Sequence, residues 1–128
     1  MNIENVFKNI IKIQFLFAVV IIISAFFEDL EYVELDVVSE TLYNTLSIWS
    51  LIYLVVYVVN LYFLYKFKPI GKTLYLPLII LGFILSSLFP YEQSTSVDFY
   101  IEWMDGLLSG LVIALLYFTD IKDKFKET

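Results

Sequence analysis

The chain has 128 residues, of which 60% are apolar and 19% aromatic, and it carries a net charge of −6. A folded domain of this size leaves about a third of its chain surface in contact with solvent, so a chain this apolar cannot hide its hydrophobic side chains in one core. The absence of Cys, His and Arg excludes disulfides, the commonest general base and bidentate phosphate clamps, and the acidic balance argues against nucleic-acid binding.

Four apolar stretches predict helices that cross a lipid bilayer, which takes about 20 residues each. We expect spans at residues 7–27, 42–65, 73–90 and 99–119. The first contains Lys8 and Lys12, whose long side chains reach back to the interface. The fourth is long enough only if it takes in Glu102 and Asp105. The sequence therefore predicts an all-α membrane protein with a single domain, residues 1–128, folded as an up-and-down four-helix transmembrane bundle.

Two of the three connections between these spans are informative. The first is an acidic loop, residues 28–41, which we interpret as a solvated connection, with cation or basic-partner binding as the alternative. The second, residues 66–72, contains Pro69 and Gly71, which are typical turn residues and predict an antiparallel hairpin of the second and third spans.

The charges predict the orientation of the bundle. All eight lysines fall in three places that share one side of a four-span protein: Lys8, Lys12, Lys66, Lys68, Lys72, Lys122, Lys124 and Lys126. By the positive-inside rule this side is cytoplasmic, so both the N and the C terminus are cytoplasmic. Aromatic residues near the lysines, Tyr75 among them, are expected to mark the inner interface.

A polar stripe follows one face of the second span. Its members recur at spacings of three and four residues: Tyr43, Ser47, Ser50, Tyr53, Tyr57 and Asn60. Such a stripe avoids lipid. We interpret it as interhelical hydrogen bonding, with the wall of a polar cavity or conduction path as the alternative.

The fourth span carries the strongest candidate for an ion site. Glu102 and Asp105 are three residues apart on one helix face, with Ser109 one turn further. Carboxylates inside a membrane are costly and are functional candidates, whereas acids that reach the outer headgroups are topology markers. We expect Asp105 to be the more buried of the two acids. With Tyr53, Tyr57 and Asn60 they form a candidate polar or ion site, and we predict no catalytic residue, metal site or cofactor.

The same span has small residues at every fourth position. Gly106, Gly110 and Ala114 form a ridge that lets another helix approach closely. The sequence leaves open whether this helix belongs to the same chain or to a second copy.

Three segments carry a resemblance to small four-span bacterial membrane proteins without an assigned function. They are residues 64–68 closing the second span, residues 72–75 opening the third, and residues 108–118 followed by a lysine-rich tail. In size and topology the chain also resembles the membrane immunity proteins that protect producers of pore-forming bacteriocins. The resemblance implies a multi-pass protein of a bacterial inner membrane.

We therefore expect a non-enzymatic membrane interaction protein, an accessory, regulatory or immunity-type subunit. Its partners would be the lipid bilayer and either another membrane protein or further copies of itself, with no nucleic acid. The alternative is a small oligomeric ion channel or a proton- or cation-coupled transporter.

Overall fold

The computed structural model describes residues 2–27, 37–88 and 96–126, and within these ranges every regular element is a helix. The helices are α1 (Ile3–Phe27), α2 (Val37–Tyr65), α3 (Pro69–Leu88), α4 (Ser96–Phe118) and the short α5 (Ile121–Lys124). The first four are long and apolar enough to cross a membrane by length and composition. This confirms the prediction of an all-α chain with four candidate spans.

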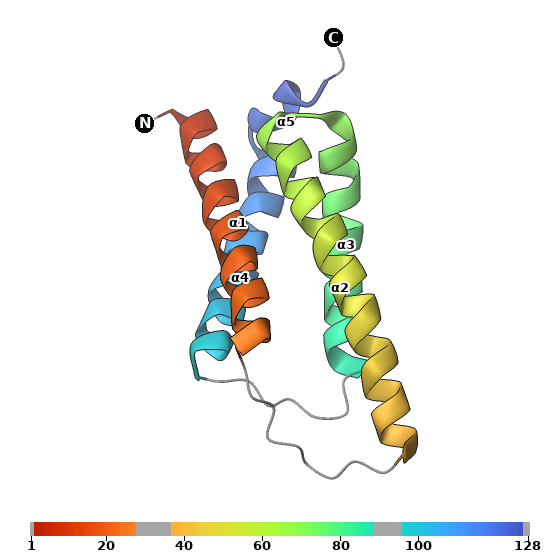
Figure 1. Ribbon diagram of the computed structural model, residues 1–128. Coiled ribbons are helices and arrows are strands. Elements are labelled where there is room, and N and C mark those ends of the chain that lie inside the picture. Colours follow the sequence, from red (N-terminus) through yellow and green to blue (C-terminus); the bar gives the residue numbers. More distant parts are fainter. Residues whose placement is uncertain (1, 28–36, 89–95, 127–128) are drawn as a thin grey trace.

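The four long helices form two pairs, α1 with α4 and α2 with α3 (Figure 1). The pairs meet at the end of the bundle that carries both termini and α5, and they diverge toward the other end (Figure 1). All eight lysines belong to the segments at the end with the termini. The grouping of the lysines expected from the sequence is therefore present in the fold.

All four long helices begin before the expected spans, α1 at Ile3 rather than near residue 7. α2 starts at Val37, so residues 37–41 of the expected acidic loop are helical, while residues 28–36 lie outside the described part of the chain. α3 starts at Pro69 rather than near residue 73, and α4 starts at Ser96 rather than near residue 99. The expected spans come from the stretches without charges, which give only the apolar part of each helix. The helices begin earlier because backbone hydrogen bonding continues through the polar residues next to that part.

The turn between α2 and α3 is built by Phe67 rather than by Pro69 and Gly71. Phe67 has a φ of 54°, the left-handed conformation that usually takes glycine at the end of a helix. The amide of Lys68 donates to the carbonyl of Phe63 at 2.8 Å, and that of Phe67 donates to the carbonyl of Leu64 at 3.0 Å, which caps α2. Pro69 then opens α3, where its missing N–H costs nothing.

Gly71 lies inside α3 and permits the closest contact of the hairpin. A Cβ atom at this position would lie 2.8 Å from the backbone nitrogen of Leu64 and 2.9 Å from the backbone carbon of Phe63. Gly82 makes the second close approach, to the hydroxyl of Tyr53. The antiparallel hairpin predicted from the sequence is present, and it depends on two glycines to which the sequence analysis gave no packing role.

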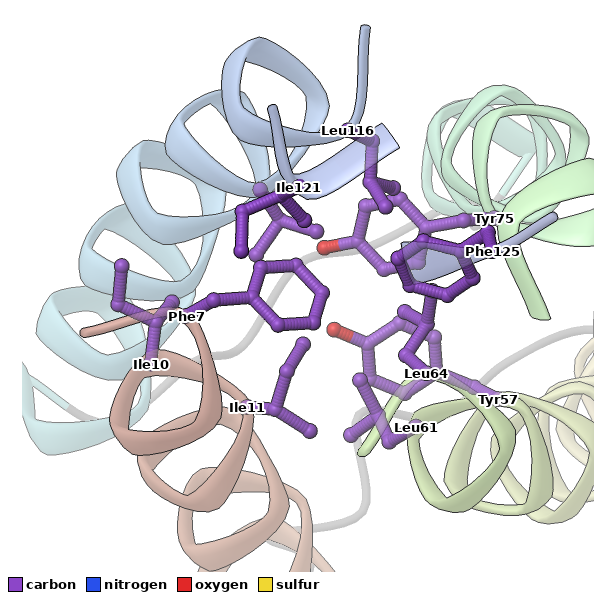
Figure 2. Close-up of a cluster of buried hydrophobic side chains, with 11 residues drawn as sticks. Phe7, Ile10, Ile11, Tyr57, Leu61, Leu64, Tyr75, Leu116, Ile121 and Phe125 are labelled. Carbon is purple, nitrogen blue, oxygen red and sulfur yellow. The ribbon is translucent and has the colours of Figure 1, made fainter. Parts of the chain in front are cut away.

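The apolar core lies at the end of the bundle with the termini (Figure 2). Its centre is an aromatic group in which the Phe7 ring contacts the rings of Phe67 at 5.7 Å and Phe125 at 6.0 Å between centroids. Phe67 and Phe125 are themselves 5.3 Å apart. These contacts explain why a phenylalanine occupies the left-handed turn position, since the ring binds three separate parts of the chain together.

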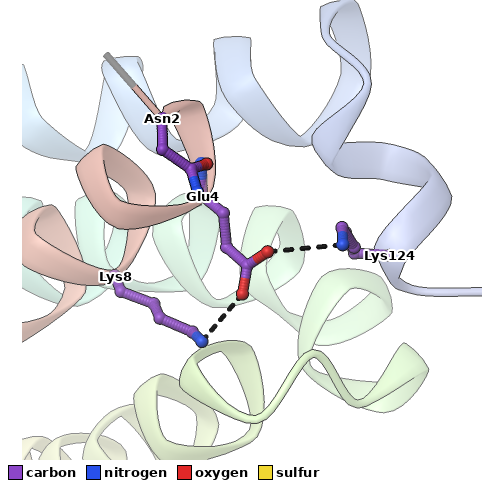
Figure 3. A network of polar contacts seen from close by, with 4 residues as sticks. All are labelled: Asn2, Glu4, Lys8 and Lys124. Atoms are coloured by element: carbon purple, nitrogen blue, oxygen red, sulfur yellow. Dashed lines mark hydrogen bonds and ion pairs between the residues drawn. The ribbon is translucent and has the colours of Figure 1, made fainter.

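Charged side chains surround this core. Glu4 accepts from Lys8 at 2.9 Å and from Lys124 at 3.3 Å, which links α1 to α5 (Figure 3). The Lys8 ammonium also lies 5.1 Å from the Phe67 ring centroid, and that of Lys72 lies 5.3 Å from the Tyr117 ring centroid. The cation–π contacts hold the lysines beside aromatic rings at one level of the bundle, as is typical of a membrane interface.

The remaining surface of the long helices is strongly apolar. Large side chains stay exposed on every one of them, such as Leu16 at 58%, Leu51 at 60%, Phe83 at 70% and Leu107 at 60%. Soluble monomers rarely expose apolar surface of this extent. The fold therefore presents the lipid-compatible exterior that the composition predicts.

Candidate functional site

A buried glutamine on α1 gathers polar groups from two other helices. The Gln14 side chain is completely buried, and its Nε2 atom lies 3.0 Å from the Tyr75 hydroxyl, 3.0 Å from Ser109 Oγ and 3.3 Å from Asp105 Oδ1. The Tyr75 hydroxyl in turn lies 3.2 Å from Gln14 Oε1. We call Gln14, Tyr75, Asp105 and Ser109 the Gln14 cluster. It joins α1, α3 and α4.

One assignment of hydrogens satisfies the glutamine completely. An amide nitrogen has two hydrogens and its oxygen only accepts. If the Tyr75 hydroxyl donates to Oε1, both hydrogens on Nε2 are free to bind Ser109 and Asp105. The amide, although it belongs to an apolar helix, is therefore the best-satisfied polar group of the cluster.

Helix α2 brings Tyr57 to the same place. Its ring lies beside the core, and its hydroxyl points between the two helix pairs in the same direction as that of Tyr75 (Figure 2). Tyr57 is 5% exposed and interacts electrostatically with Tyr75 and Asp105. Its hydroxyl has no partner at standard hydrogen-bond distance among the described residues, although it interacts with Ser109 and Asp105 of the cluster, and a buried polar atom without a close partner is unusual in proteins.

Asn60 is a second buried polar side chain without a partner. It is 1% exposed, and neither its amide nitrogen nor its oxygen forms a hydrogen bond within the described ranges. The hairpin register places it in the fold: because Tyr53 lies against Gly82 and Leu64 lies against Gly71, the backbone of Asn60 is level with that of Tyr75. Asn60 therefore lies at the level of Tyr75 along the hairpin, whereas the interactions of Tyr57 reach the cluster itself.

The structure brings together some of the predicted site residues and separates others. Asp105 is half-buried and Ser109 is buried, and Gln14 joins them. Glu102 is exposed on α4. Tyr53 is half-buried and stacks on Tyr57, with ring centroids 6.0 Å apart. Tyr75, expected at the inner interface, is instead completely buried with its hydroxyl on Gln14.

The lysines leave Asp105 without a positive partner. Among the described residues, the ion pairs formed by lysines involve Glu4 and Asp123, both at the end with the termini. No group of three or more metal-ligating His, Cys, Asp or Glu side chains occurs in the part of the chain that the structure describes. The cluster is therefore rich in hydroxyl and amide oxygens and holds one carboxylate.

The small-residue ridge of α4 faces away from the bundle. Gly106, Gly110 and Ala114 are all exposed, and a Cβ atom on either glycine would meet no described atom within 4 Å. This contrasts with Gly71 and Gly82, whose α-carbons lie directly against α2. The ridge is not used for packing among the described helices of this chain.

Gln14 is the site residue that the sequence analysis missed. Between Lys12 and Ser24 it is the only polar residue, and a lone amide in an otherwise apolar span avoids lipid for the same reason as the tyrosine stripe. A search for carboxylates and for repeated polar residues does not find Gln14, because it is uncharged and stands alone in its apolar stretch.

The chain was compared with family models, with curated proteins and with solved structures, and none of the three comparisons gave a match.

Proposed function

We propose that the chain is a non-enzymatic integral membrane protein of a bacterial inner membrane that recognises another membrane protein through α4. The observation that carries the proposal is the ridge of Gly106, Gly110 and Ala114, which is exposed and open along its length. In lipid, helices associate through close packing rather than through the hydrophobic effect, and small residues permit that closeness.

The surroundings of the ridge fit the same function. Large apolar side chains next to it on α4 are exposed, such as Met104 at 49%, Leu107 at 60% and Leu111 at 52%. A partner helix seated on the glycines would contact these side chains on both sides of the groove. The partner is a transmembrane helix of another protein or of a second copy, and the accessory, regulatory or immunity-type role follows from binding it.

The orientation is part of the proposal. The lysines at the end with the termini support a cytoplasmic location of both termini by the positive-inside rule. A reporter that is active only in the cytoplasm, fused after Thr128, tests this location. Activity at residue 128 together with external protease access in residues 28–36 is expected. An external tail would overturn the orientation.

Gly110→Leu tests the ridge. Because no described atom lies near the Cβ position and leucine favours a helix more than glycine does, the substitution should not lower the helix content or the thermal stability of the isolated protein. It should weaken association, measured by energy transfer between labelled copies and by crosslinking to neighbours in native membranes. The matched control is Leu111→Ile beside it on α4, an apolar exchange at an exposed position. Equal association of both variants would contradict a role for the ridge.

A second candidate function is a small oligomeric ion channel or a proton- or cation-coupled transporter, and the buried Gln14 cluster favours it. Ion flux into proteoliposomes separates the two candidates. Ion flux that disappears in Asp105→Asn would support transport. Absence of ion flux with the unaltered protein would argue against transport and favour partner recognition.

A further inference from the structure

We propose that the Gln14 cluster and the Tyr57 hydroxyl together bind one monovalent alkali cation, for which Na⁺ is the test ion. This inference does not rest on the proposed partner recognition, because none of its residues belongs to the exposed ridge.

The first argument is charge. An ionised carboxylate taken out of water costs several kcal/mol unless a positive charge accompanies it. Asp105 lies half-buried in a bundle with a lipid-compatible exterior, and the ion pairs of the described lysines involve Glu4 and Asp123 rather than Asp105. A single carboxylate supplies a single negative charge, which one monovalent cation neutralises.

The second argument is the unused oxygen atoms. Alkali cations prefer hard oxygen ligands such as carboxylates, hydroxyls and amide carbonyls. Ser109 supplies a hydroxyl and Asp105 a carboxylate, and Tyr57 adds a buried hydroxyl that interacts with both but has no partner at standard hydrogen-bond distance among the described residues. Figure 2 shows that this hydroxyl points between the helix pairs rather than into either pair.

The glutamine completes the ligand set by turning its amide. Rotation by half a turn exchanges the positions of Oε1 and Nε2, which then places the oxygen toward Ser109 and Asp105. The contact with Tyr75 survives, because that hydroxyl lies within hydrogen-bond distance of both amide atoms and accepts as well as donates. The same glutamine thus satisfies the cluster in the absence of the ion and becomes a ligand in its presence.

The position of the site gives the ion a structural effect. Its ligands come from α1, α2 and α4, with Tyr75 of α3 holding the glutamine, so one ion would join both helix pairs. The cluster adjoins the core, of which Tyr75 is a member. Binding should therefore stabilise the folded bundle, as any ligand of the native state does.

The experiment measures thermal unfolding of the purified full chain in detergent against NaCl concentration, with choline chloride keeping the ionic strength constant. We expect a saturable rise of the unfolding midpoint with Na⁺ and none with choline. Asp105→Asn removes the charge but keeps the shape and an acceptor for Gln14, so the rise should disappear. Tyr57→Phe removes one ligand and should shift the half-maximal Na⁺ concentration upward by about tenfold, as loss of one contact to a charged group does. Glu102→Gln is the matched control, because it removes an exposed acid from the same helix.

The outcomes decide the proposal. A response to Na⁺ in the native chain and in Glu102→Gln, lost in Asp105→Asn, supports it. Equal unfolding midpoints in Na⁺ and choline, or a Na⁺ response that persists in Asp105→Asn, would overturn the proposal. If Asp105→Asn does not fold, the comparison of Tyr57→Phe with Glu102→Gln decides, and an equal Na⁺ response of these two variants would overturn the proposal.

Discussion

The Tyr75 hydroxyl on α3 hydrogen bonds to Oε1 of Gln14 on α1, although the two residues are 61 positions apart in the sequence. The contact joins helices from different pairs. Its phenol and amide groups lie among apolar side chains. A polar side chain in the interior of a membrane bundle is stabilised only by partners of this kind.

The first prediction concerns this contact. Gln14→Leu should lower the free energy of unfolding by about 2 kcal/mol, because it leaves Tyr75, Ser109 and Asp105 without their shared partner. Unfolding in mixed detergents measures the change. Phe15→Leu, at an exposed neighbouring position, is the control and should have a small effect. A leucine at position 14 that leaves the stability unchanged would show that the cluster adds nothing to folding.

The second prediction compares two glycines. Gly71→Ala should destabilise the protein, since the new methyl group meets the backbone of α2 at about 2.8 Å and the overpacking cost of about 1–3 kcal/mol exceeds the gain in helix propensity. Gly106→Ala should stabilise the isolated chain by up to about 1 kcal/mol, because its methyl group meets no described atom. Thermal unfolding of both variants is the measurement. The opposite order would mean that α3 does not pack on α2 through Gly71.

The third prediction concerns the aromatic core. Phe125→Ala should cost about 3 kcal/mol, because the ring is 4% exposed and contacts both Phe7 and Phe67. Phe118→Ala removes the same ring from a position that is 84% exposed and should cost far less in detergent. Similar losses of stability in the two variants would argue against a packed core at this end.

The fourth prediction is a titration in the tail. The Lys126 ammonium lies 2.6 Å from Asp123, and its hydrogen bond and charge hold the pKa of that carboxyl below its ordinary value of 3.8. Since the pKa is lowered in the folded state, the small contribution to stability is present above pH 3.8 and is lost as the pH falls through the lowered value. Lys126→Gln should raise the pKa, followed by the chemical shift of the carboxyl carbon.

Lys122→Gln is the control for this titration, because Lys122 acts on Asp123 only through its charge. It should raise the pKa less than Lys126→Gln does. An equal rise in both variants would contradict a specific hydrogen bond from Lys126.

The helical spans were predictable because lipid imposes a length and a composition on every helix that crosses it. Hydropathy shows where α1 to α4 lie to within a few residues, and the lysines indicate which ends share a side. The starts of α2 and α3 were not predictable in this way, because Val37 and Pro69 lie beyond the apolar stretches.

The candidate site was only partly predictable. Asp105 and Ser109 are one turn apart on α4, so their shared face follows from helix geometry alone. Their contact with Gln14 depends on how α1 packs against α4, which a residue pattern within one helix does not contain. For the same reason, the sequence could identify Gly106 and Gly110 as small but could not show that they face outward while Gly71 and Gly82 face α2.

The aromatic group of Phe7, Phe67 and Phe125 also orders the assembly of the protein in time. Ribosomes make Phe7 before the α2–α3 turn and that turn before Phe125. The group cannot close until Phe125 has been made, so α1 and the α2–α3 hairpin are synthesised before the third ring is in place. A chain that stops before Phe125 keeps the contact of Phe7 with Phe67 but lacks the third ring that packs against both.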